Sequence, residues 1–158
     1  MRLAIHEQID ADAVRTLKRI EHEVSDELAG CLAVVAVDPS LSIEESLEEG
    51  ARFAGLLGPP EREITREEAA AVLEGLVERD LAYRARRPGS VSAASTAEEF
   101  LGMFPGSEAR FFTNGEMGLT HALGKTGAWS PLTRATFDTG VVAIDRGRLG
   151  VFWVEDED

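Results

Sequence analysis

The segment from residue 137 to residue 154 constrains the fold of this chain more than any other. Phe137 to Ile144 and Leu149 to Val154 are both predicted as strands, with Asp145-Arg146-Gly147 as the turn between them. We expect a three-residue loop with the glycine in the left-handed region, because the arginine would resist that conformation in a two-residue turn. Apolar side chains alternate onto both faces of this hairpin. We therefore expect a buried antiparallel β-hairpin at the centre of a sheet.

Three segments carry the pattern of a capping box, in which a serine or threonine is followed three residues later by glutamate. The three pairs are Ser42 with Glu45, Thr65 with Glu68, and Thr96 with Glu99. In each pair the hydroxyl accepts a hydrogen bond from the third backbone N–H, and the glutamate reaches back to the N–H of the cap. We predict that a helix begins at each of these positions.

Apolar periodicity predicts how far the helices extend. We predict helices over residues 12–28, 42–57 and 97–103, besides the one that follows Thr65, and Gly30 is predicted to stop the first of them. Residues 31–37 form an apolar run that periodicity does not assign. A buried helical piece is our prediction for this run because its surroundings are helical, and a buried strand is the alternative.

These elements predict an α+β fold with two parts. A helical N-terminal lobe, residues 1–87, packs on a small mixed C-terminal lobe, residues 96–158, which ends in the hairpin. Residues 88–95 are rich in Gly, Ser and Ala and are predicted as a linker. About sixty residues alone bury too little surface for a stable fold, so we expect the two lobes to share one core.

The net charge of the chain limits which classes of partner we expect it to bind. The chain has 29 acidic and 16 basic residues, which gives a net charge of −13. Such a charge repels nucleic acids and anionic membranes and favours a basic protein as partner. Cys31 is the only cysteine, which excludes an internal disulfide and fits a reducing compartment. With no apolar run long enough for a bilayer, we expect a cytoplasmic protein, and no cofactor is implied.

Two motifs resemble known ones. Gly124-Lys125-Thr126 resembles the end of a phosphate-binding loop, but Leu119 stands where that motif needs glycine, so we reject a nucleotide triphosphatase. Residues 65–87 resemble the helix-then-wing end of winged-helix proteins. That resemblance implies a winged-helix-like regulator, but the helix carries Glu67, Glu74 and Glu78 where a DNA-reading helix exposes basic residues, so DNA binding is not expected.

Two groups of residues are candidate sites. The loop before the hairpin combines an aromatic anchor with hydrogen-bonding side chains, and His121 lies in a nearby glycine-rich segment. The candidate binding residues are Trp129, Ser130, Thr133, Arg134, His121 and Asp138. The hairpin register also brings Asp138 near Glu155 and Asp156, where a hard cation such as Mg²⁺ or Ca²⁺ would bridge them. The alternative is a frayed and solvated acidic C-terminus.

Two functional hypotheses of different classes follow. The first is a non-enzymatic acidic protein-binding module, such as a small regulator or an inhibitor that covers a basic surface of its partner. The second is a carboxylate-based enzyme or small-ligand binder, with or without a divalent cation, that uses Asp138, Asp145 and His121. A cavity that joins these side chains favours the second hypothesis, and scattered, solvated carboxylates favour the first.

Overall fold

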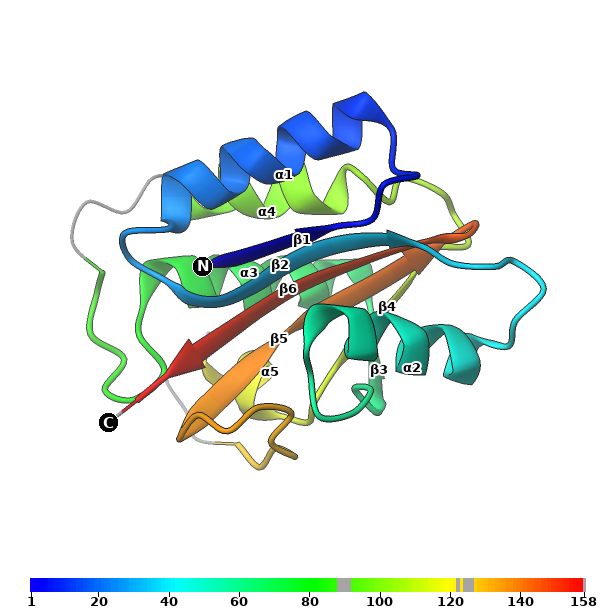
Figure 1. Ribbon diagram of the computed structural model, residues 1–158. Coiled ribbons are helices and arrows are strands. Elements are labelled where there is room, and N and C mark those ends of the chain that lie inside the picture. Colours follow the sequence, from blue (N-terminus) through cyan, green and yellow to red (C-terminus); the bar gives the residue numbers. More distant parts are fainter. Residues whose placement is uncertain (88–91, 122, 124–126, 158) are drawn as a thin grey trace.

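The computed structural model describes residues 1–87, 92–121, 123 and 127–157 (Figure 1). The described residues form five helices and six strands. In chain order these are β1 (Arg2–Ile5), α1 (Ala11–Val24), β2 (Ala29–Ala36), α2 (Ile43–Ala54), β3 (Arg62–Ile64), α3 (Arg66–Glu78), α4 (Ala93–Leu101), β4 (Arg110–Thr113), α5 (Met117–His121), β5 (Phe137–Asp145) and β6 (Arg148–Asp156). The predicted α+β class is confirmed.

All six strands belong to one mixed sheet with the order β1-β2-β6-β5-β4-β3. β1 runs parallel to β2, and the other neighbouring strands are antiparallel. The hairpin of β5 and β6 lies at the centre of the sheet and is buried along most of its length, as predicted. The sheet joins both parts of the chain, because β1, β2 and β3 come from residues 1–87 and the other strands from residues 96–158.

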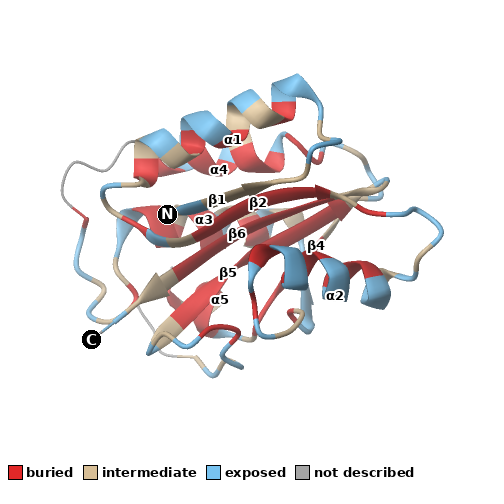
Figure 2. Cartoon of the chain, in the orientation of Figure 1, coloured by how far each residue is buried: buried red, intermediate tan, exposed pale blue. Residues whose placement is uncertain are grey.

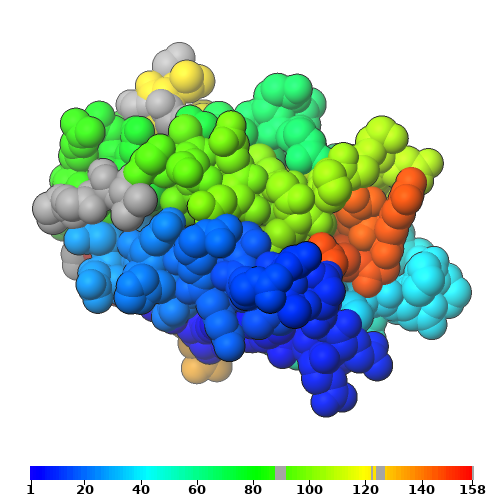
Figure 3. Space-filling view, turned by 90° about the horizontal axis from the view of Figure 1, so that it is seen from above, coloured from blue at the N-terminus to red at the C-terminus, as the bar shows by residue number. Residues whose placement is uncertain are grey.

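The helices cover the sheet on both faces (Figures 1 and 2). α1, α3, α4 and α5 pack on one face, where β6 contributes Phe152 and Val154 to the core. α2 packs on the other face, where β6 contributes Val151 and Trp153. Figure 3 shows α1 and α4 side by side on the outside of the first layer, where Arg19 Nε donates to Glu99 Oε2 at 3.0 Å. No helix in the described part of the chain has the length and apolarity that crossing a bilayer requires.

Two of the three predicted capping boxes are confirmed. Ser42 Oγ and Thr65 Oγ1 each accept a hydrogen bond from the backbone N–H three residues later at 3.1 Å. The carboxylates of Glu45 and Glu68 in turn accept from the backbone N–H of Ser42 and Thr65. The prediction for Thr96 is wrong, because α4 begins earlier with Ser92 as its N-cap. The additional turn places Ala93 in the core, and Thr96 becomes a buried residue inside the helix.

The helix predicted for residues 31–37 is wrong, because residues 31–36 belong to β2. β2 lies between β1 and β6 and is buried on both faces, with Leu32 in one core cluster and Ala33 in the other. A strand buried on both faces is apolar at every position, so it carries no period that separates it from a buried helix. Gly30 is likewise a β2 residue and not a helix stop, because α1 already ends at Val24.

The hairpin turn also differs from the prediction. Asp145 pairs with Arg148, so the loop has two residues and not three. Arg146 and Gly147 both have positive φ, 47° and 79°, which is the pattern of a type I′ turn. This turn matches the right-handed twist of the two strands, and the long, buried pairing of β5 with β6 offsets the strain at the arginine.

Candidate functional site

A cavity of about 270 Å³ lies where the turn after α3 meets α5 and the start of β5. The turn, residues 79–87, lines it with Leu81, Ala82, Tyr83 and Arg84. The other lining residues are Met117 and His121 of α5, Gly127, Trp129 and Phe137. We call this cavity the aromatic pocket. Segments distant in the chain therefore build one concave surface, as is typical of small-molecule sites.

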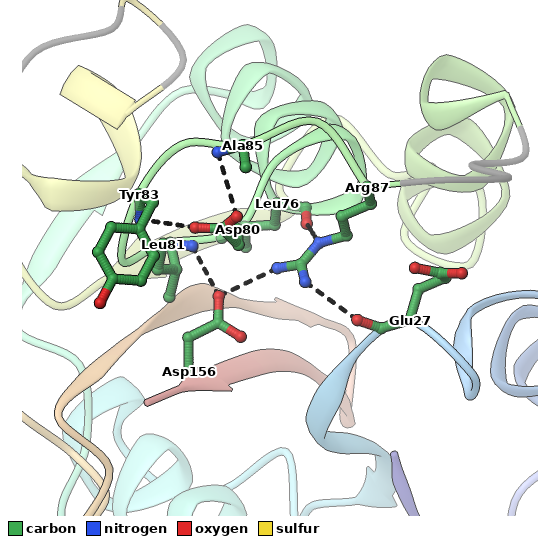
Figure 4. A network of polar contacts seen from close by, with 8 residues as sticks. All are labelled: Glu27, Leu76, Asp80, Leu81, Tyr83, Ala85, Arg87 and Asp156. Atoms are coloured by element: carbon green, nitrogen blue, oxygen red, sulfur yellow. Dashed lines mark hydrogen bonds and ion pairs between the residues drawn. The ribbon is translucent and has the colours of Figure 1, made fainter. Parts of the chain in front are cut away.

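A buried ion pair fixes the 79–87 turn against the sheet (Figure 4). Arg87 Nη2 donates to Asp156 Oδ2 at 3.1 Å, and the backbone N–H of Leu81 donates to the same oxygen at 2.6 Å. The guanidinium also donates to the carbonyls of Leu76 and Glu27, so one side chain joins α3, the segment after α1 and β6. The solvated acidic C-terminus considered above is thus wrong for Asp156, whose side chain is only 16% exposed.

Removing the charge of Asp156 is expected to destabilise the protein. Asp156→Asn leaves the Arg87 guanidinium without its carboxylate, and the loss of a hydrogen bond to a charged group costs about 1.5–3 kcal/mol of unfolding free energy. Urea unfolding followed by circular dichroism measures this loss. Glu157→Gln is the matched control, because Glu157 is exposed, and we expect a change of about 0.5 kcal/mol or less. Equal midpoints for the two variants would contradict the role of the ion pair.

The 79–87 turn holds Arg84 in a left-handed conformation with φ 58°. The Asp80 carboxylate accepts from the backbone N–H groups of Tyr83 at 2.6 Å and Ala85 at 3.1 Å (Figure 4). The N–H of Asp80 donates to the carbonyl of Ala85, and Arg79 Nη1 donates to the carbonyl of Arg84. These bonds determine the backbone on both sides of Arg84 and offset the cost of positive φ at a residue with a Cβ.

His121 at the end of α5 is buried, with 3% of its surface exposed. Its Nε2 has no hydrogen-bond partner among the described residues. Burial is the main cause that lowers the pKa of His121; the positive charges of Arg84 and Arg87 lower it further, and the carbonyls of Arg79 and Gly75 oppose the shift. The imidazole is therefore neutral at pH 7, and its two ring nitrogens provide one donor and one acceptor.

The lowered pKa of His121 predicts a pH dependence of stability. As the pH falls below about 6.5, the unfolded chain binds a proton at this histidine before the folded chain does. The free energy of unfolding should therefore decrease as the pH is lowered from about 6.5 through the pKa of His121 in the folded protein. The decrease is at most about 1.4 kcal/mol per pH unit. His121→Gln should lose this part of the slope in urea unfolding between about pH 7 and pH 5. His22→Gln, at an exposed position of α1, should keep it; a His121→Gln slope equal to that of the natural protein would contradict the prediction.

Trp129 and Phe137 form the aromatic wall of the pocket. Their rings stack with centroids 5.9 Å apart and planes at 29°. An antiparallel bridge between Trp129 and Gly115 and the pairing of Phe137 with Asp156 set the two ring positions. Trp129 Nε1 is buried and has no hydrogen-bond partner among the described residues. The wall thus offers a flat apolar face and one unused N–H donor.

Asp138 organises the loop that connects Trp129 to β5. Its carboxylate is fully buried and accepts from Asn114 Nδ2 at 2.9 Å, Thr133 N and Oγ1 at 2.7 Å each, and Leu132 N at 3.1–3.2 Å. Asn114 Oδ1 in turn accepts from Thr139 Oγ1 at 2.8 Å. Asp138 therefore works as the acceptor at the centre of a buried network that shapes the loop.

The structure separates the candidate binding residues that the sequence indicates. Trp129 and His121 line the aromatic pocket, and Thr133 bonds to Asp138 instead. Ser130 lines a neighbouring hollow with Asn114 and Leu132, and Arg134 is exposed in the loop. Tyr83, Arg84, Met117 and Phe137 line the pocket and were not candidates. No local pattern in the sequence places Arg84 beside His121, because the two residues are 37 positions apart and meet only through the fold.

The candidate metal residues take different places. Asp138 and Glu155 are cross-strand partners, whereas Asp156 belongs to the opposite face of the sheet and bonds to Arg87 and Leu81. Asp145 lies at the other end of β5, where it accepts from the N–H of Gly106. Within the described ranges, no three His, Cys, Asp or Glu side chains are arranged to hold a metal ion. Residues 124–126, which resemble a phosphate-binding loop, lie outside the described residues.

Comparisons of the chain with models of protein families, with curated proteins and with solved structures found no match.

Proposed function

We propose that this protein binds a small molecule with a flat aromatic ring in the aromatic pocket. The observation that carries the proposal is the meeting of the stacked Trp129–Phe137 wall with the buried, unpartnered Nε2 of His121 in one cavity. Sites for small molecules combine apolar and aromatic walls with a few convergent polar groups, and this pocket has that composition.

The unused polar groups support a ligand with its own polar atoms. A buried donor or acceptor without a partner costs about 1–3 kcal/mol, and natural proteins retain few such groups. Nε2 of His121 and the indole N–H of Trp129 are both of this kind among the described residues. A ring that stacks beside Trp129 and carries a hydrogen-bonding group would provide their partners. The pocket thus supplies recognition groups, and we propose binding as its role.

This proposal takes up the small-ligand alternative from the sequence and keeps only His121 of its three residues. Asp138 and Asp145 have no part in it, because each already accepts hydrogen bonds within the fold. The acidic protein-binding module stays a prediction. Its best location would be α2, where Glu44, Glu45, Glu48 and Glu49 are exposed.

The test uses the two indole N–H signals of ¹⁵N-labelled protein in a titration with indole-3-acetamide, a neutral aromatic probe. We expect a saturable shift of the Trp129 signal and none of the Trp153 signal, because Trp153 is fully buried on the other face of the sheet. Trp129→Phe assigns the two signals.

A matched pair of variants locates the response. Tyr83→Ala removes the exposed ring at the pocket and should weaken the titration, whereas Phe53→Ala, an exposed ring on α2, should leave it unchanged. A titration in which neither indole signal moves up to the solubility limit of the probe would refute the proposed function.

A further inference from the structure

The two buried nitrogens of the aromatic pocket that lack a partner among the described residues are Trp129 Nε1 and His121 Nε2. An indole nitrogen only donates, so Trp129 needs an acceptor from a ligand. A neutral imidazole has one nitrogen that donates and one that accepts. Which of these two roles His121 Nε2 has therefore decides what chemistry the pocket recognises.

The backbone around His121 sets its tautomer. Burial lowers the pKa of His121, and hydrogen bonds with the carbonyls of Arg79 and Gly75 oppose that shift. A carbonyl oxygen only accepts, so the ring nitrogen that bonds to these carbonyls carries the hydrogen. Because Nε2 has no partner within the described part of the chain, that nitrogen is Nδ1. Nε2 is then the unprotonated nitrogen, a buried acceptor with an unused lone pair.

We infer that the ligand is a neutral nitrogen heteroaromatic compound that donates an N–H to His121 Nε2 and accepts a hydrogen bond from Trp129 Nε1. This inference rests on the proposed function and names its ligand class. One flat molecule with a ring N–H and a ring acceptor nitrogen supplies both partners while its ring packs against the aromatic wall. The cavity of about 270 Å³ lies just below the range of drug-sized sites, which suits a ligand of one or two rings.

The neutral charge of the ligand follows from the same two groups. A carboxylate at His121 Nε2 would set one acceptor against another, because neither carries a hydrogen. An ammonium group donates as well, but it would lose its hydration without gaining an opposite charge from the imidazole or the indole. A neutral N–H loses less hydration and forms the same hydrogen bond. The wall therefore selects an uncharged donor.

The first test needs no ligand. Long-range ¹H–¹⁵N spectra of the histidine rings distinguish a protonated from an unprotonated ring nitrogen, and His121→Gln assigns the signals of His121. At neutral pH we expect a protonated Nδ1 and an unprotonated Nε2 in this ring. The exposed His22 is the control and should show the averaged signals of two exchanging tautomers. A His121 ring protonated at Nε2 would overturn the inferred ligand class and leave the proposed function standing.

The second test compares three bicyclic probes of nearly the same size at neutral pH. Benzimidazole has an N–H and an acceptor nitrogen, benzoxazole has oxygen in place of the N–H, and indole lacks the acceptor nitrogen. Shifts of the backbone amide signals of α5 give the dissociation constant of each probe for the full chain. We expect benzimidazole to bind about threefold to tenfold more tightly than either of the others, the difference that one hydrogen bond supplies.

Two further measurements assign the hydrogen bonds. Trp129→Phe keeps an aromatic ring in the wall and removes its N–H, so benzimidazole should lose its advantage over indole and keep its advantage over benzoxazole. Phe53→Ala, on α2 at the other face of the sheet, is the control and should keep both advantages. The Nε2 signal of His121 should move when benzimidazole or indole binds, and much less when benzoxazole binds.

The outcomes separate the two proposals. If none of the three probes binds up to its solubility limit, the proposed function fails and the inference fails with it. If all three bind with equal dissociation constants, the pocket is an aromatic site and the inferred ligand class is overturned. An advantage over indole that persists in Trp129→Phe, or a His121 Nε2 signal that responds equally to benzoxazole, overturns the assignment of the two hydrogen bonds.

Discussion

Asp138→Ala is expected to lower the free energy of unfolding by about 2–6 kcal/mol, because it leaves the backbone N–H groups of Leu132 and Thr133 buried without an acceptor. Each such donor costs about 1–3 kcal/mol, and Asn114 Nδ2 retains two carbonyl acceptors, of Ser130 and Asp138. A loss of this size is a large part of a typical total of about 5–15 kcal/mol.

The measurement is urea unfolding followed by circular dichroism, with the midpoint and the slope compared separately. Asp138→Asn should recover only part of the loss, since its amide turns an N–H₂ group toward backbone N–H donors. Asp26→Ala is the control, because Asp26 is exposed, and it should change stability by about 0.5 kcal/mol or less. An Asp138→Ala protein as stable as the control would show that the network does not hold the loop.

Gly30→Ala is the second variant with a large expected effect. A Cβ at this position would lie 2.0 Å from the carbonyl oxygen of Trp153, and the φ of +136° is one that L side chains rarely adopt. The backbone of β2 or β6 must therefore move where Gly30 pairs with Val154. Strain at φ and overpacking each cost about 1–3 kcal/mol, so we expect a loss of about 2–6 kcal/mol or a failure to fold.

Gly58→Ala provides the comparison, because nothing lies within 4 Å of a Cβ built at Gly58. It should be neutral or slightly stabilising, through the smaller conformational entropy of the unfolded chain. Soluble yield and the unfolding midpoint of the two variants give the result. A Gly30→Ala protein that unfolds at the natural midpoint would contradict the close approach of β2 and β6.

The sequence located part of the candidate site. Trp129 and His121 were candidates because they combine an aromatic ring and an imidazole with a loop-rich segment, and both line the aromatic pocket. Asp138 was a candidate for its charge, and its bonds within the fold take up both oxygens. A carboxylate that binds a cation and one that accepts backbone N–H groups are identical in a sequence, because only the surrounding donors distinguish them.

Local interactions determined what the sequence alone could predict. The caps at Ser42 and Thr65 depend on residues three positions apart, and the hairpin of β5 and β6 depends on neighbours across one short turn. These features can be predicted because the interactions that form them are short-range. Few residues take part in each, and all of those residues lie in one segment of the chain.

Tertiary structure decided the rest. Residues 31–36 are a strand because β1 and β6 pair with β2 on its two sides. The N-cap of α4 is Ser92 and not Thr96, because the earlier turn buries Ala93. The aromatic pocket has the same origin, because Arg87 and Asp156, 69 positions apart, hold the 79–87 turn against β6. Contacts between distant segments depend on how the whole chain packs. No local pattern of residues encodes which of them will meet.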